Sequence, residues 1–121
     1  MSDPVAIANA YITTWNATDT PQREATLATH WTANASYVDP LMSASDTQGI
    51  SGLVSAVHQR FPGFRFTLTG TPDGHGNYVR LSWSLGPAGA EPPVRGSDLI
   101  VLQGGRISQV IGFIDQAPAA L

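Results

Sequence analysis

The chain has 121 residues, of which 42% are hydrophobic and only 12% are charged, and its formal net charge is −3. This length predicts one domain over residues 1–121, and the low, slightly acidic charge excludes the basic surface that a nucleic-acid partner requires. The sequence has no cysteine, which excludes disulfides and thiolate metal sites, and it shows no signal peptide or membrane span, so we expect a cytoplasmic protein without membrane contact.

Three amphipathic helices are predicted in the first half of the chain. The first begins at Asp3-Pro4, an acid that can cap free amides followed by proline at the first helical position. Its apolar residues repeat at helical spacing, as Val5, Ala8, Ile12 and Trp15. The second helix begins at Thr20-Pro21. The third carries Ile50, Leu53, Val54, Val57 and Phe61, and Pro62-Gly63 ends it.

The period changes from helical to alternating after residue 63, which predicts β-strands. The runs 64–69, 78–85, 94–102 and 106–115 are predicted as strands, with turns at TPDGHGN and GPAGAEPP. A short extended segment, ASYVDP, precedes the third helix. Helices early and strands late predict an α+β domain in which a curved sheet wraps around the helices and leaves a concave face for a pocket.

Two aspartates share strand faces with apolar residues. Asp39 lies on the same side of an extended segment as Ala35 and Tyr37, and Asp98 alternates with Ile100. A carboxyl group directed at an apolar interior is costly unless it is paired, protonated or functional. Burial and a neighbouring acid push the pKa values of two such groups apart, so that one acts as a base and the other as a protonated donor.

Each candidate also has a structural interpretation. Asp39 is typical of an acid that caps a loop through backbone amides. Asp98 could pair with Arg80 or Arg95 in a buried ion pair. Tyr11, on the first helix, could pack in the core with its hydroxyl satisfied. The three histidines show no metal-ligand spacing, so no metal site is predicted.

The order and spacing of several short motifs resemble the nuclear transport factor 2-like superfamily, with its SnoaL-like polyketide cyclases and ketosteroid isomerases. The motifs cover nearly the whole chain: AYITTW, YVDP, QGISGL, VRLSWSLG, GSDLIVL, GGRI and VIGFID. The resemblance implies a cone-shaped, strongly curved antiparallel sheet packed on three N-terminal helices, with a pocket at the wide end. It also implies a homodimer through the outer sheet face.

The resemblance further implies roles for individual residues. In ketosteroid isomerases a tyrosine on the first helix and a protonated aspartic acid on a late strand donate to the substrate oxygen, while an aspartate before a proline moves the proton. Tyr11, Asp98 and Asp39 match these positions. Eight residues are expected to contact the substrate: Trp15, Trp31, Val57, Phe61, Leu81, Trp83, Ile100 and Gly112.

Two departures from the family refine the expectation. Val57 stands where isomerases often carry a further pocket tyrosine, and Gly112 stands where epoxide hydrolases of this fold carry a second acid, which disfavours epoxide hydrolysis. The resulting hypothesis is an isomerase or polyketide cyclase without cofactor or metal, acting on an apolar carbonyl compound. The alternatives are a non-catalytic pocket for a small apolar ligand and a dimeric assembly domain.

Overall fold

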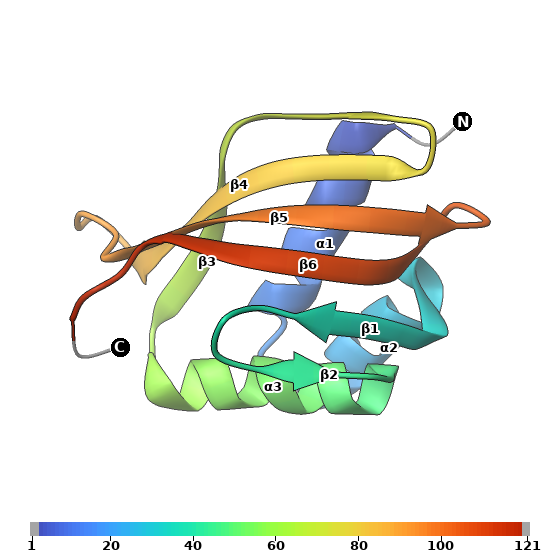
Figure 1. Ribbon diagram of the computed structural model, residues 1–121. Coiled ribbons are helices and arrows are strands. Elements are labelled where there is room, and N and C mark those ends of the chain that lie inside the picture. Colours follow the sequence, from blue (N-terminus) through green and yellow to red (C-terminus); the bar gives the residue numbers. More distant parts are fainter. Residues whose placement is uncertain (1–2, 120–121) are drawn as a thin grey trace.

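The computed structural model describes residues 3–119, which form three helices and one six-stranded sheet (Figure 1). The predicted α+β class with a curved sheet is confirmed. The elements follow the order α1 (Pro4–Asn16), α2 (Thr20–His30), β1 (Trp31–Val38), β2 (Ser43–Ala44), α3 (Thr47–Arg60), β3 (Phe64–His75), β4 (Tyr78–Pro87), β5 (Val94–Gln103) and β6 (Arg106–Gln116).

An aspartate caps the N-terminus of each helix. In every case the carboxylate accepts a hydrogen bond from a backbone amide of the first turn, which has no partner inside the helix. The pairs are Asp3 with Val5, Asp19 with Gln22 and Asp46 with Gly49. The predicted start of α1 is confirmed, and α3 ends just before Pro62 and Gly63 as predicted.

The strand order of the sheet is β2-β1-β6-β5-β4-β3. All neighbours are antiparallel except β1 and β6, which run parallel. The sequence predicts a wholly antiparallel sheet, and the parallel pair is a difference. It arises because β1 and β6 are joined through α3 and four further strands, and a local alternation of side chains carries no information on the direction of so distant a partner.

β3 is longer than the sequence predicts. Pro72, Asp73 and Gly74 resemble turn residues, yet the strand continues to His75 and its pairing register with β4 shifts between Thr69 and Asp73. The register shift accommodates Pro72, which has no backbone N–H to donate to the neighbouring strand, and the turn itself follows at 76–77.

Helices and sheet enclose a common core. Figure 1 shows α1 crossing behind the strands, while α2 and α3 lie on the side of β1 and β2. The largest fully buried side chains come from every layer, and they include Trp31, Tyr11, Ile50, Ile100 and Ile107.

A buried arginine fixes the helices to one another. Arg23 is only 2% exposed, and its guanidinium donates to the Ala17 carbonyl and to the hydroxyls of Ser51 and Ser55, each at 2.8 Å. Within residues 3–119 no carboxylate lies within ion-pair distance of it. Neutral partners therefore hold this charge between the α1–α2 connection and α3.

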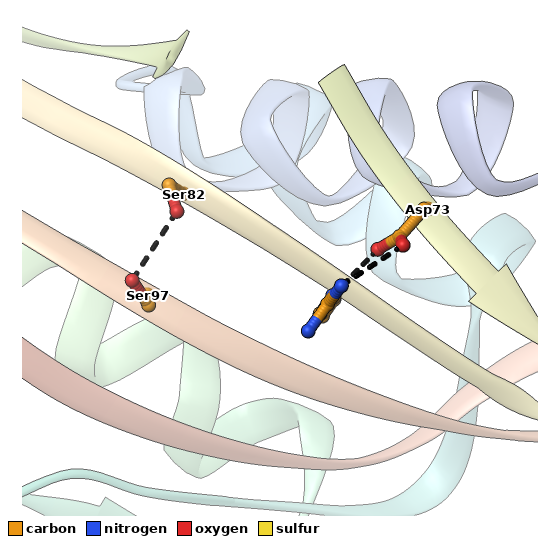
Figure 2. A network of polar contacts seen from close by, with 4 residues as sticks. Asp73, Ser82 and Ser97 are labelled. Carbon is orange, nitrogen blue, oxygen red and sulfur yellow. Dashed lines mark hydrogen bonds and ion pairs between the residues drawn. The ribbon is translucent and has the colours of Figure 1, made fainter. Parts of the chain in front are cut away.

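The outer sheet face, which points away from α1, is partly polar. Figure 2 shows Ser82 and Ser97 bonded across β4 and β5, with an oxygen–oxygen distance of 3.2 Å, and Asp73 on β3 in a separate ion pair. Its partner is Arg80, whose Nε lies 2.7 Å from Asp73 Oδ1. Phe113 also stands on this face and is 56% exposed.

Candidate active site

A narrow cavity of about 70 Å³ lies between the sheet, α1 and α3. Its wall is apolar except at one end, where two tyrosines and two aspartates meet: Tyr11, Tyr37, Asp39 and Asp98. The apolar wall consists of Ile12, Trp15, Leu41, Met42, Val57, Phe61, Phe66, Trp83, Leu85, Val94 and Ile114. A second hollow of about 320 Å³ shares Leu41, Met42, Val57 and Phe61 with the cavity, so the two adjoin at these four residues.

Strand register brings the two acids together. Asp98 on β5 pairs with Gly112 on β6, and Val38, the last residue of β1, pairs with Ile111, so Asp39 follows next to Gly112. A Cβ atom at Gly112 would lie 2.9 Å from Asp98 Oδ1 and 3.2 Å from the Asp39 Cβ. The missing side chain of Gly112 is therefore what allows both acids to converge.

Tyr11 and Asp98 form a buried pair. The Tyr11 hydroxyl donates to Asp98 Oδ2 at 2.5 Å, and the two residues are 1% and 4% exposed. Burial raises the pKa of Asp98 from 3.8 to about 6, while the bond from Tyr11 opposes this rise and the nearby Asp39 adds to it. Burial, with Asp98 beside it, also raises the pKa of Tyr11 well above its ordinary value, so the phenol keeps its proton.

Tyr37 and Asp39 form a second pair at the end of β1. The Tyr37 hydroxyl donates to Asp39 Oδ2 at 2.6 Å, and the backbone amides of Leu41 and Met42 donate to Oδ1 at 2.8 and 3.0 Å. Asp39 therefore accepts three hydrogen bonds on its two oxygens, which fixes the orientation of its side chain. Burial, followed by the nearby Asp98, raises the pKa of Tyr37, so this phenol also remains a donor.

These contacts bear on the structural interpretations of the acids. Asp39 caps the loop after β1 and lines the cavity as well, so both of its interpretations hold in the geometry. Asp98 pairs with neither candidate arginine, because Arg80 pairs with Asp73 and Arg95 pairs with Glu91.

Some of the residues expected to contact a substrate line the cavity and others do not. Trp15, Val57, Phe61 and Trp83 belong to its wall. Gly112 is not part of the wall. It lies next to the two acids, and the absence of a side chain there leaves room for both carboxyl groups.

Trp31, Leu81 and Ile100 are outside the wall, because their side chains pack in the buried core around it. The Trp31 indole donates to the Thr14 hydroxyl at 3.1 Å instead. Core and cavity wall use the same residue types in a hollow fold, and the sequence alone does not separate them.

Sequence reasoning missed Tyr37 as a member of the polar cluster. It assigned this tyrosine to the apolar side of β1 and left its hydroxyl without a role. The available signal was its spacing from Asp39, since residues two apart on a strand point to the same face.

Two further findings concern metals and membranes. Among residues 3–119 no three histidine, cysteine, aspartate or glutamate side chains lie close enough together to hold a metal ion. In the same part of the chain no helix has the length and apolar character needed to cross a lipid bilayer.

The fold and the cavity define a class of small α+β proteins in which a curved sheet and helices enclose an apolar pocket with a polar end. A family model for the SnoaL-like domain matches residues 8–110, and the chain belongs to this family. The resemblance found in the sequence is thereby confirmed. No curated protein matches the chain.

Solved structures show the same relationship. A protein from Agrobacterium tumefaciens, provisionally named an isomerase of the SnoaL-like family, is 43% identical, with a TM-score of 0.87 over 91% of this chain and 95% of that one. A provisionally named polyketide cyclase from Sinorhizobium meliloti is 15% identical, with a TM-score of 0.70 over 88% and 93% of the two chains. A provisionally named ketosteroid isomerase from Kribbella flavida is 19% identical, with a TM-score of 0.70 over 95% and 79%. The last two likenesses concern the fold alone.

Proposed function

We propose that this protein is an acid–base enzyme without a cofactor, an isomerase or polyketide cyclase, whose substrate is an apolar carbonyl compound. The observation that supports the proposal is the pairing of each carboxyl group with its own tyrosine hydroxyl at the polar end of an apolar cavity. The 43% identity to a provisionally named isomerase of the SnoaL-like family supports the same class of reaction.

Asp39 is the proposed base. Its carboxylate takes a proton from the carbon next to the carbonyl group, the C–H electron pair moves into the new C=C bond, and the carbonyl π electrons move onto oxygen to give an enolate. An isomerase returns the same proton to a carbon further along the conjugated system. A cyclase instead uses the enolate carbon to attack a second carbonyl group.

Tyr11 is the proposed donor to the enolate oxygen, and a protonated Asp98 is proposed to free the Tyr11 hydrogen for this role. The single hydroxyl hydrogen of Tyr11 is directed at Asp98 Oδ2. When Asp98 is protonated it can donate to the Tyr11 oxygen instead, and the phenol hydrogen becomes available to the substrate. Donors fixed in a cavity from which water is excluded stabilise such a developing charge strongly.

The proposal is tested with 3-cyclohexen-1-one in D₂O, a small ring ketone chosen because the cavity is narrow. NMR follows exchange of the hydrogens next to the carbonyl, and ultraviolet absorbance follows formation of the conjugated 2-cyclohexen-1-one. We expect Asp39→Asn to lower the exchange rate by at least about 100-fold, the usual contribution of a positioned base. Asp46→Asn, at the exposed cap of α3, is the matched control and should keep the wild-type rate.

The outcomes separate the candidate functions. Exchange with formation of 2-cyclohexen-1-one supports an isomerase, and exchange without it supports a cyclase. Binding of the ketone with no exchange in either the wild type or Asp39→Asn would overturn the enzyme proposal and favour a non-catalytic ligand pocket.

We also propose that two copies of the chain associate through the outer sheet face. The support is a hollow of about 670 Å³ on this face, lined in part by the exposed apolar side chains Leu99 and Phe113. Their burial against a second copy removes apolar surface from water, and a two-fold arrangement would use the same patch on both subunits.

A further inference from the structure

Two polar atoms in side chains that line the cavity are buried without a hydrogen-bond partner. They are the indole nitrogen Nε1 of Trp15 and the Oδ1 oxygen of Asp98, in side chains that are 3% and 4% exposed. Nearly all buried polar groups in folded proteins have a partner, because water no longer compensates for a missing bond. An unpaired donor in the wall of a cavity therefore indicates a place for a ligand acceptor.

The two hydroxyl donors at this end are already committed, and the Trp83 indole, which also lines the cavity, lowers the pKa of Asp98 as a hydrogen-bond donor. The single hydrogen of the Tyr11 hydroxyl goes to Asp98, and that of Tyr37 goes to Asp39. The Trp31 indole donates to Thr14, outside the cavity wall. The Trp15 N–H differs from these because it makes no hydrogen bond of ordinary geometry, although the indole lies close enough to Tyr11 to act against the rise in the pKa of that phenol.

The position of Trp15 suits a donor beside Tyr11. It lies one helical turn after Tyr11 on α1, and the centroids of the two rings are 6.4 Å apart. Its indole also packs against Tyr37 and Phe66, with centroid distances of 5.2 and 5.5 Å. Packing on several sides fixes the direction of the N–H group and lowers the cost of orienting it when a ligand binds.

We propose that the Trp15 Nε1–H group donates a hydrogen bond to the carbonyl oxygen of the bound ligand, beside the Tyr11 hydroxyl. The class of ligand rests on the proposed function, whereas the donor rests on the geometry of the cavity. Trp15 thus selects compounds with a carbonyl oxygen over hydrocarbons of the same shape. It is available whether Asp98 is protonated or ionised, since its hydrogen is shared with neither acid.

The test uses the indole ¹H–¹⁵N signals of the wild-type protein, which has three tryptophans, Trp15, Trp31 and Trp83. Each signal is assigned by a tryptophan-to-phenylalanine variant. On addition of 2-cyclohexen-1-one we expect the Trp15 N–H proton to move downfield, as it does when a hydrogen bond forms. The Trp31 signal is the internal control and should stay in place, because its hydrogen remains bonded to Thr14.

Affinity gives a second measurement. Trp15→Phe keeps an aromatic ring and removes the N–H group, so it should weaken binding of 2-cyclohexen-1-one about 2- to 10-fold. The affinity for cyclohexene, which has the ring without the oxygen, should be unchanged. If Trp15→Phe does not fold, the wild-type spectra still decide the question.

The inference is overturned if 2-cyclohexen-1-one does not bind, if it binds without moving the Trp15 signal, or if cyclohexene moves that signal equally. Because this ligand is bound and not converted, a wild type that shows no proton exchange would overturn the proposed function and leave this result standing. Proton exchange together with an unmoved Trp15 signal would overturn the role of Trp15 and leave the proposed function standing.

Discussion

The Tyr11 hydroxyl lies 2.5 Å from Asp98 Oδ2, although the two residues are 87 positions apart in the chain. This contact joins α1 to β5 inside the cavity, and it makes the protonation state of one residue depend on the other.

Removing the Tyr11 hydroxyl should raise the pKa of Asp98 above its value of about 6. The phenol donates to the carboxylate and stabilises the charged form, so Tyr11→Phe leaves burial unopposed by this bond. A ¹³C titration of the Asp98 carboxyl group measures the change. Tyr78→Phe, at an exposed tyrosine of β4, should leave the titration as it is, and an Asp98 pKa that falls in Tyr11→Phe would contradict the stabilisation of the charged carboxylate by the Tyr11 hydroxyl.

Asp98 should make the protein less stable as the pH rises. Its folded pKa of about 6 exceeds the ordinary value of 3.8, so its stabilising contribution is complete below pH 3.8 and is lost as the pH rises through about 6. Asp98→Asn removes this titration. The free energy of unfolding of the wild type, relative to that variant, should fall by about 3 kcal/mol across the interval. Urea unfolding at several pH values checks it, and a constant difference would contradict it.

Gly112→Ala should destabilise the fold and impair the site. The added Cβ would stand 2.9 Å from Asp98 Oδ1 and 3.3 Å from the Tyr37 hydroxyl, so the acids must move apart, at about 1 to 3 kcal/mol. Gly52→Ala is the matched control, because Gly52 is exposed within α3 and its added Cβ would have no neighbour within 4 Å. The control should gain about 0.5 to 1 kcal/mol. Equal thermal unfolding of the two variants would refute the spacing role of Gly112.

Arg23→Lys should lower the free energy of unfolding by about 2 to 3 kcal/mol. A single ammonium group cannot reach the Ala17 carbonyl and both serine hydroxyls in the fork geometry of a guanidinium, so buried acceptors lose their partners. Arg65→Lys, at an exposed position of β3, should change the stability by less than about 0.5 kcal/mol. Chemical denaturation of both variants measures the difference, and similar values would show that the buried network contributes little.

Phe113→Glu should convert a wild-type dimer into a monomer, because it places a charge in the apolar part of the proposed contact between two outer sheet faces. Sedimentation equilibrium over a range of concentrations measures the change. Val5→Glu, at an exposed apolar residue of α1, is the control and should leave the mass unchanged. A wild type that is monomeric at the highest concentration contradicts the proposal.

Local patterns predicted the parts of this fold that depend on local chemistry. The Asp3-Pro4 start and the Pro62-Gly63 end were readable because capping and the geometry of proline act within a few residues. The inward direction of Asp98 was readable from alternation with Ile100. The parallel pairing of β1 with β6 could not be predicted from local patterns, because it depends on where the chain returns after the intervening elements.

The candidate site was predicted in outline for similar reasons. The convergence of Asp39 and Asp98 on Gly112 depends on the register of three strands, to which the family resemblance pointed and which the residues alone did not fix. Tyr37 was missed because its ring belongs to the core while its hydroxyl belongs to the site. Trp31 was expected in the cavity wall but lies in the core. The sequence pattern predicts that a residue is buried, but it does not predict whether that residue borders a cavity.

The loop cap formed by Asp39 has a consequence for interpreting relatives of this protein. Because the same carboxylate holds two backbone amides of the cavity rim, a homologue that has lost all activity would still be under pressure to keep an acid there. An aspartate at this position is therefore a poor diagnostic of catalysis. Asp98 caps no turn and destabilises the fold when it is ionised. Its retention in a homologue, together with Tyr11, is therefore the better marker of a working enzyme.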